Sequence, residues 1–217
     1  MRNVNVTGAP SPRLLRACAL FGLRPMRTAR AAASRETRLA AAQVLSTLAP
    51  GQIALLSGPS GGGKTTLLRA CRAELVSRHE AVAFFSRPPL GTRRTLIDST
   101  PGAMRDALRD LARAGLADAT LLARCTRELS EGQRWRWALA RMLRTRPRWL
   151  LIDEFVSTLD RPAARGVCRA LRRHARDVNC RVIVATAHDD VATWLEPDMR
   201  VRVELQMPPR VEVRDGL

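Results

Sequence analysis

The sequence is poor in several residue types, and each shortage excludes a class of protein. It has no tyrosine, aromatic residues make up only 4% of it, and Lys64 is its single lysine. The five cysteines are widely spaced with no CxxC pair, which excludes a disulfide framework and a zinc ribbon and indicates a reducing, cytoplasmic compartment. No run approaches the roughly 18 uncharged apolar residues of a membrane span, so we expect the chain to have no span of its own.

Arginine, by contrast, is abundant. It accounts for 36 of the 37 basic residues, and the net charge is +17. Such a charge often indicates a nucleic-acid or anionic partner. Here arginine is spread along the whole sequence, which is typical of a compositional bias, so nucleic acid stays one of several candidate partners. With 217 residues, 46% of them hydrophobic, the chain can form one compact domain with a small appendage.

The first 38 residues differ in pattern from the rest. Residues 1–38 contain prolines and many arginines without a steady apolar period, and predict an irregular basic N-terminal segment with a short helix near residues 14–20. Seven arginines precede the first acidic residue, Glu36, so a transit peptide is the alternative to a loosely ordered tail. Residues 39–217 are predicted to form a single domain.

In that domain, strand patterns alternate with helix patterns. Short apolar runs predict buried strands at residues 53–56, 81–85, 149–152 and 182–186. Helical patterns follow or separate them at residues 65–77, 101–114, 130–144 and 162–176. An edge hairpin is predicted at about residues 200–214. This order predicts an α/β fold with a mostly parallel sheet and flanking helices.

A glycine-rich segment after the first of these strands matches the phosphate-loop pattern GxxxxGK[ST]. It consists of Gly58, Pro59, Ser60, Gly61, Gly62, Gly63, Lys64 and Thr65, followed by Thr66. Glycines let backbone N–H groups approach phosphate oxygens, and the following helix adds its positive end. In such a loop the lysine contacts the β- and γ-phosphates and the threonine hydroxyl binds Mg²⁺. The segment therefore predicts a site for a nucleoside triphosphate.

Two carboxylates end the strand at residues 149–152. Ligands of an open parallel sheet bind beyond the carboxyl ends of its strands, so Asp153 is expected to face Lys64 and to hold Mg²⁺. Glu154 can orient and deprotonate an attacking water. A solvated loop acid is the alternative interpretation of Glu154.

The sequence LSEGQ at residues 129–133 opens the next helix. Ser130 and Gln133 form an S-x-x-Q capping box, which by itself explains both residues as a helix start. Gly132 is a poor helix former in the first turn and is expected where a phosphate approaches the backbone closely.

Taken together, these motifs resemble those of ATP-binding cassette (ABC) ATPases. LSEGQ is similar to the family signature LSGGQ, with Glu131 in place of the first glycine. STLD at residues 157–160 resembles the D-loop, and AHD at 187–189 resembles the switch histidine segment. The stretches LSEGQRWR at residues 129–136, DEFVSTLDR at 153–161 and IVATAHDD at 183–190 also resemble a lineage of ABC ATPases often fused to a predicted acetyltransferase domain. This resemblance implies an acetyltransferase-like partner as a separate chain.

The resemblance implies a P-loop NTPase fold of ABC type and a mechanism. Two copies pack head to tail around two Mg-ATP, and Ser130, Gly132 and Gln133 of one copy face the ATP of the other. His188 holds the γ-phosphate and the attacking water, Glu154 acts as base, and Asp160 communicates between the sites. The resemblance thus predicts a cytoplasmic, dimeric ATP hydrolase that drives a conformational change in a partner.

Departures from the family pattern bear on that partner. Transport cassettes carry a glutamine after the second strand, but no Gln occurs between Gln52 and Gln133. The segment at about residues 87–145 is short, which predicts a reduced helical arm. The aromatic residue that stacks on adenine is also missing, unless Arg35 or Arg38 replaces it. The missing glutamine and the short arm count against a transporter subunit, which stays an alternative, as does a nucleic-acid-associated ABC ATPase.

Overall fold

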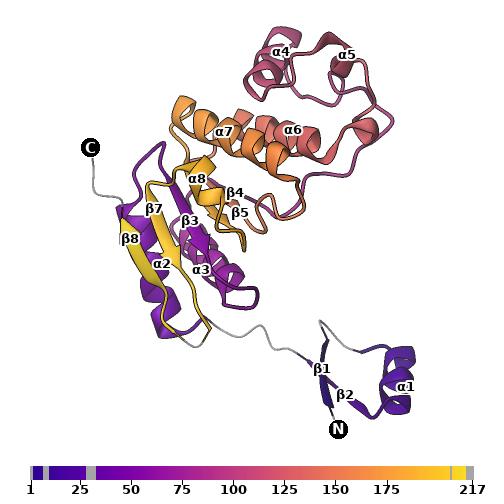
Figure 1. Ribbon diagram of the computed structural model, residues 1–217, viewed down its shortest axis with the longest axis vertical. Coiled ribbons are helices and arrows are strands. Elements are labelled where there is room, and N and C mark those ends of the chain that lie inside the picture. The colour runs from indigo at the N-terminus through magenta and orange to yellow at the C-terminus, as the bar shows by residue number, and fades with distance from the viewer. Residues whose placement is uncertain (1, 7–9, 28–32, 206, 214–217) are drawn as a thin grey trace. The chain divides into compact units, whose positions relative to one another are not determined.

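The computed structural model describes residues 2–6, 10–27, 33–205 and 207–213. The chain forms two compact units, Met1–Ser34 and Arg35–Leu217 (Figure 1). The division falls four residues before the predicted one, because helix α2 (Arg35–Thr47) begins at Arg35 and packs in the larger unit.

The small unit has more regular structure than the predicted irregular segment. Strands β1 (Arg2–Val6) and β2 (Leu23–Arg27) pair in parallel, and helix α1 (Pro12–Leu20) connects them. The hydroxyl of Ser11 caps α1 by accepting a hydrogen bond from Leu14 N–H at 3.2 Å. The strands were not predicted because RNVNV and LRPMR lack an apolar run.

The large unit is built on a six-stranded sheet in the order β4-β5-β6-β3-β7-β8. Its strands are β3 (Ile53–Ser57), β4 (Val82–Phe85), β5 (Trp149–Ile152), β6 (Arg181–Ala185), β7 (Met199–Arg202) and β8 (Arg210–Val213). All neighbours pair in parallel except β7 and β8, which form an antiparallel hairpin at the edge. The mostly parallel α/β sheet predicted from the apolar runs is confirmed, and β3, β5 and β6 lie where those runs occur.

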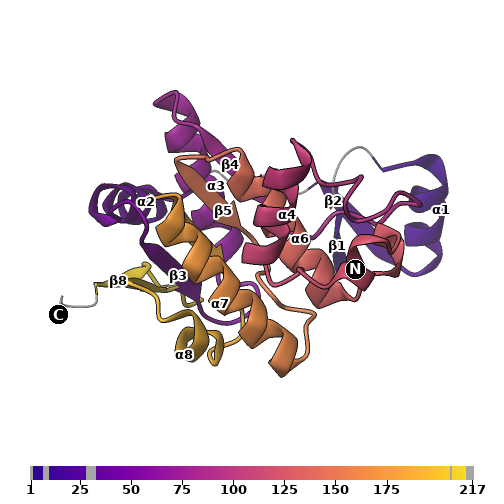
Figure 2. The same ribbon diagram turned by 90° about the horizontal axis from the view of Figure 1, so that it is seen from above.

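Helices cover both faces of this sheet (Figures 1 and 2), and its strands β3, β5 and β6 are accordingly almost entirely apolar. Helices α2 and α3 (Lys64–Ser77) pack on one face. Helices α6 (Glu131–Arg144), α7 (Arg161–Asp177) and α8 (Val191–Leu195) pack on the other. No helix among the described residues has the length and apolar character that crossing a membrane requires.

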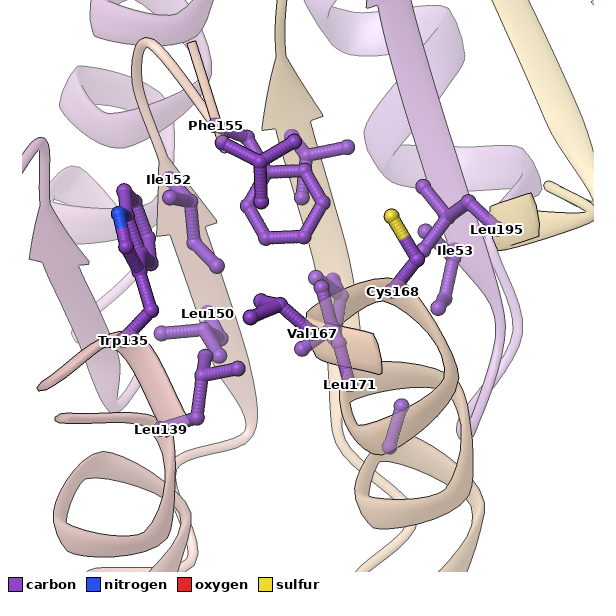
Figure 3. Close-up of a cluster of buried hydrophobic side chains, with 14 of the residues drawn as sticks. Ile53, Trp135, Leu139, Leu150, Ile152, Phe155, Val167, Cys168, Leu171 and Leu195 are labelled. Carbon is purple, nitrogen blue, oxygen red and sulfur yellow. The ribbon is translucent and has the colours of Figure 1, made fainter. Parts of the chain in front are cut away.

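The core between the sheet and α6–α7 fixes the ends of the strands (Figure 3). Trp135 of α6 contacts Phe155, with ring centroids 5.7 Å apart in an edge-to-face arrangement. Phe155 follows β5 directly, and its N–H donates to the carbonyl of Ala185 in β6 at 2.8 Å. The turn after β5 is therefore anchored to the core at the edge where the predicted carboxylates lie.

The chain between β4 and β5 forms a small helical arm. It contains α4 (Met104–Arg113), α5 (Ala119–Leu122), a short 3-10 turn (Thr126–Glu128) and α6. A separate cluster that includes Leu96, Leu111, Leu116 and Trp137 forms its core. Trp137 of α6 therefore faces the arm, whereas Trp135, two residues earlier, faces the sheet.

Candidate functional site

The turn between β3 and α3 can form only because of its glycines. Gly58 has φ of 136°, and a Cβ on it would lie 2.0 Å from the carbonyl oxygen of Val203. Gly61 and Gly63 have φ of 79° and 103°, which side-chain-bearing residues rarely adopt. The chain therefore leaves β3 in a tight loop and enters α3 at Lys64.

The N-terminus of α3 faces a cavity of about 400 Å³. This cavity is lined by Ser60, Gly61, Gly63, Lys64, Thr65, Thr66, Asp153, Glu154, Ser157, Ala185, Thr186 and Ala187. No side chain caps α3, and its first turn holds no acidic residue. The free N–H groups and the positive end of the helix thus create a site for an anion.

The side chain of Lys64 forms hydrogen bonds to the backbone of its own loop. Its Nζ donates hydrogen bonds to the carbonyl oxygens of Gly58 and Pro59 at 2.7 and 2.8 Å. Burial lowers the pKa of Lys64 from 10.5, and the nearby carboxylates of Asp153 and Asp189 oppose this shift. The hydrogen-bond acceptors of this ammonium in the free loop are neutral carbonyl oxygens. A phosphate that entered the loop would give it a negatively charged acceptor instead.

Thr65 and Asp153 meet at the base of the cavity. The hydroxyl of Thr65 donates to Oδ1 of Asp153 at 3.1 Å, and Asp153 is buried at the end of β5. A hydroxyl and a single carboxylate suit Mg²⁺, which keeps several waters and takes further ligands from substrate phosphates. The described residues contain no group of three His, Cys, Asp or Glu that would make an all-protein metal cage.

Glu154 lies beside Asp153 in a strained backbone conformation. Its φ is 49°, its N–H donates to Oδ1 of Asp153 at 3.1 Å, and its exposed side chain borders the cavity. Left-handed backbone at a non-glycine residue costs free energy and persists where the surrounding structure imposes it. Here the anchored Phe155 imposes it, and the carboxylate is directed to the edge of the cavity rather than into the core.

The segment after β6 brings His188 near the same cavity. Its Nε2 lies 3.2 Å from the carbonyl oxygen of Ser157, and its N–H donates to the hydroxyl of Thr186 at 3.3 Å. Ser157, Thr186 and Ala187 also line the cavity. The sequence analysis included Ser157 and Ala187 in the D-loop-like and switch-like segments, and Thr186 in a predicted strand, but gave none of them a role in the site.

Ser130, Gly132, Gln133 and Asp160 are not among the residues that line the cavity. Ser130 and Gln133 form the expected reciprocal capping box, with bonds of 2.9 and 3.2 Å. Gly132 is packed against α7, since a Cβ on it would lie 3.1 Å from that of Ala163. The structure therefore gives Gly132 a packing role in addition to the one expected from the sequence.

Asp160 and Glu131 tie the start of α6 to the start of α7. Asp160 caps α7 by accepting a hydrogen bond from Ala163 N–H at 2.7 Å. Glu131 accepts a hydrogen bond from the hydroxyl of Thr158, a contact that the sequence analysis did not predict. The segment at residues 157–160 thus connects the cavity, through Ser157, to the LSEGQ helix, through Thr158.

Comparison with known proteins agrees with this arrangement. A family described as an AAA domain matches residues 49–195. The chain is 30% identical over 191 residues to a lipoprotein-releasing system ATP-binding protein of Rhodopirellula baltica, covering 73% of this chain and 82% of the relative. It is 32% identical over 162 residues to a zinc import ATP-binding protein of Roseobacter denitrificans, covering 68% and 63%.

The chain belongs to the ATP-binding cassette family. A solved dimer of the ATP-binding cassette MJ0796 in a post-hydrolysis state, bound to ADP and Pi, has the same fold, with a TM-score of 0.59 and 22% identity. That match covers 79% of this chain and 89% of the solved one. The cassette described here spans a little under two thirds of the length of the first curated relatives it matches, 63% and 64% for two zinc import proteins.

Proposed function

We propose that the chain binds and hydrolyses Mg-ATP in a head-to-tail dimer and drives a conformational change in a partner. The observation that carries this proposal is the pairing of Thr65 with Asp153 at 3.1 Å, beside Lys64 and below the uncapped N-terminus of α3. This arrangement offers a triphosphate an ammonium, free N–H groups and two hard oxygens for its metal ion. Membership in the ATP-binding cassette family supports it.

Within one copy, five side chains would do the chemistry. Lys64 exchanges its loop carbonyls for the β- and γ-phosphates, and Thr65 and Asp153 hold Mg²⁺, which neutralises phosphate charge when bound. Glu154 accepts a proton from the attacking water at the mouth of the cavity. His188, held beside the cavity by Ser157 and Thr186, orients that water and the γ-phosphate.

A second copy would complete the site. Ser130, Gly132 and Gln133 lie at the start of α6 and do not line the cavity of their own chain. Ser130 is exposed, so its hydroxyl and the helix start can face the γ-phosphate of the ATP held by the other copy. Asp160 and the Thr158–Glu131 bond would then transmit the state of one site to the other.

The partner is proposed from what the cassette lacks. After β4 the chain continues with Ser86 and Arg87 instead of the glutamine of transport cassettes. We therefore favour a partner outside the membrane, and an acetyltransferase-like chain is the candidate implied by the resemblance of three sequence stretches to the acetyltransferase-fused lineage. The alternative is a transporter subunit, which the names of the import and release relatives favour.

Substitution of the base tests the dimer. In Glu154→Gln, ATP stays bound because proton transfer from water is lost, so we expect a dimer with Mg-ATP and a monomer without nucleotide. Size-exclusion chromatography with light scattering measures the mass in both conditions. A monomer throughout, in a variant that still binds ATP, would contradict the head-to-tail mechanism.

Removal of the ammonium tests the phosphate assignment separately. Lys64→Ala removes the only lysine side chain of the loop, and we expect nucleotide affinity to fall at least about a hundredfold, because a charged hydrogen bond to each of two phosphates is lost. Equilibrium binding of a fluorescent ATP analogue measures the change. An affinity equal to that of the unsubstituted chain would show that the triphosphate binds elsewhere.

A further inference from the structure

Helices α7 and α8 pack together (Figures 1 and 2), and residues of both helices line a second hollow. Its volume is about 620 Å³. It is lined by Arg165, Arg169, Arg172, Arg173, Arg176, Trp194 and Thr193, together with the two acids Asp177 and Glu196. None of these residues belongs to the nucleotide site described above.

Four of these arginines form no ion pair with a carboxylate in the described part of the chain. They are Arg165, Arg169, Arg173 and Arg176, and all four are exposed. Arg172 is different, because its Nη2 donates to Asp198 at 3.0 Å. Two carboxylates, Asp177 and Glu196, also line the hollow, and the charge of Arg176 acts on Asp198, so the arginines leave an excess of positive charge there rather than a fully unneutralised row.

Ion pairs with acids join six of the arginines outside α7, so an unpaired arginine is common among the described residues, and what distinguishes α7 is the density of its arginines. Arg78 pairs with Glu74 at 2.8 Å, Arg144 with Asp110 at 2.5 Å and Arg148 with Glu80 at 3.0 Å. Helix α7 carries six arginines in 17 residues. Its buried face is apolar apart from His174, so the excess arginine is confined to the exposed side.

The spacing of the row suits a chain of phosphates. Arg165, Arg169 and Arg173 are four residues apart and share one face of the helix, and Arg176 is one turn further. At a rise of about 1.5 Å per residue, the row is roughly 16 Å long. Guanidinium groups bind phosphates through paired N–H donors, and several in a line neutralise successive phosphates of one strand.

The shape of the hollow and the presence of Trp194 indicate which kind of polyanion it can bind. The arginines line a hollow rather than a flat or protruding surface, so a flexible strand can enter it whereas a bilayer surface cannot. Trp194 forms part of the same wall and is only partly buried. An aromatic ring beside a basic groove stacks on unpaired bases, which a duplex does not offer.

We propose that the hollow between α7 and α8 binds single-stranded nucleic acid, with Arg165, Arg169, Arg173 and Arg176 on the phosphates and Trp194 against a base. The contacts use phosphates and base faces, which DNA and RNA share, so a DNA strand is a sufficient probe. The site is distinct from the ATP cavity, and its occupancy is measured without nucleotide, so the result does not depend on ATP-driven dimerisation.

The test is fluorescence anisotropy of the full chain with a labelled oligo(dT) of about twelve nucleotides at several salt concentrations. A variant that combines Arg165→Gln, Arg169→Gln and Arg173→Gln loses three positive charges and gains no negative ones. We expect Kd to rise at least about tenfold, and the slope of log affinity against log salt to fall by about 2.

A matched variant controls for net charge. Arg93, Arg105 and Arg124 are exposed in the loop and helical arm, and their replacement by glutamine removes the same charge elsewhere. We expect this control to change Kd less than about threefold. Trp194→Leu should raise Kd about tenfold with the salt slope unchanged, because stacking releases no counterions. Circular dichroism establishes that each variant is folded, and Trp194→Phe, which retains a ring, should recover most of the affinity.

Three results would overturn the proposal. The first is an equal loss of affinity in the groove and control variants, which would show that overall charge does the binding. The second is equal binding of a duplex together with no effect of Trp194→Leu. The third is groove-dependent binding to phosphatidylglycerol vesicles without groove-dependent binding to the oligonucleotide, which would identify a membrane surface as the ligand.

Discussion

At the scale of the residue, His174 shows how burial sets a response to pH. Its Nδ1 lies 2.8 Å from the carbonyl oxygen of Ala170, and its Nε2 is buried without a partner in the described part of the chain. Burial lowers the pKa of His174 from 6.5, while the bond to Ala170 and the charge of Asp177 oppose the shift and Arg113 and Arg173 add to it. The folded protein therefore holds this imidazole neutral.

This lowered pKa predicts acid sensitivity. Below about pH 6.5 the unfolded chain binds a proton at His174 that the folded chain does not, so the free energy of unfolding falls as pH falls through that value. The loss is up to about 1.4 kcal/mol per pH unit. Urea denaturation measures the free energy of unfolding at about pH 7.5 and pH 5.5. The difference between the two values should be smaller for His174→Asn than for the unsubstituted chain.

His79 provides the control for that measurement. It is exposed, with φ of 57°, a backbone conformation that asparagine tolerates. His79→Asn should leave the difference between the two pH values unchanged. The same reduction in both histidine variants would contradict the assignment of the pH response to His174.

At the scale of the element, the apolar runs explain which parts of the fold the sequence predicts. Strands β3, β5 and β6 are fully covered by helices, so each is a short uninterrupted apolar run with a recognisable end. Helix α2 was not predicted, because only Ala40, Ala41, Val44 and Leu45 mark its buried face. Two neighbouring alanines give a weak periodic signal, and packing against α3 stabilises the helix instead.

The candidate site, like the fold, has parts that the sequence predicts and parts that it does not. The phosphate loop and the Asp153–Glu154 pair could be predicted because each is a local pattern whose chemistry requires those residue types. The Glu131–Thr158 hydrogen bond joins residues 27 positions apart and depends on how α6 packs on α7. No local pattern encodes that packing, so only the structure reveals the contact.

Ser130 has both a capping role and a proposed interface role, and these are separable. Ser130→Ala removes the hydroxyl that accepts Gln133 N–H at 3.2 Å and should lower the free energy of unfolding by about 1 kcal/mol. In the Glu154→Gln background it should also abolish the ATP-dependent dimer. Urea denaturation measures the first effect and size-exclusion chromatography the second.

Asp118→Ala is the matched control, because Asp118 caps α5 by accepting Thr120 N–H at 2.8 Å and has no role in the proposed interface. It should cost similar stability and leave the dimer intact. If loss of this cap also abolished the dimer, the effect of Ser130→Ala would reflect stability alone.

At the scale of the whole molecule, the stability of the fold resides in the large unit. The three buried clusters are built from residues 40–211, on the two faces of the sheet and in the arm. The small unit contributes only Cys18 to the buried hydrophobic residues described. The large unit therefore contains everything that a cooperative core and the nucleotide cavity require.

This division predicts the result of truncation. A chain of residues 35–217 should unfold cooperatively in urea with the midpoint of the full chain, because no buried cluster loses a member. Its affinity for ATP should also be unchanged. A midpoint lowered by more than the experimental error would mean that residues 1–34 stabilise the large unit.

The single lysine in the phosphate loop has a practical consequence. Apart from the α-amino group, Lys64 is the only amine of the chain that an acylating ester can modify. Its lowered pKa increases the fraction of uncharged, nucleophilic amine at neutral pH. Bound phosphate would hold that amine protonated and shield it, so acylation of one peptide, read by mass spectrometry, reports the occupancy of the loop without any engineered label.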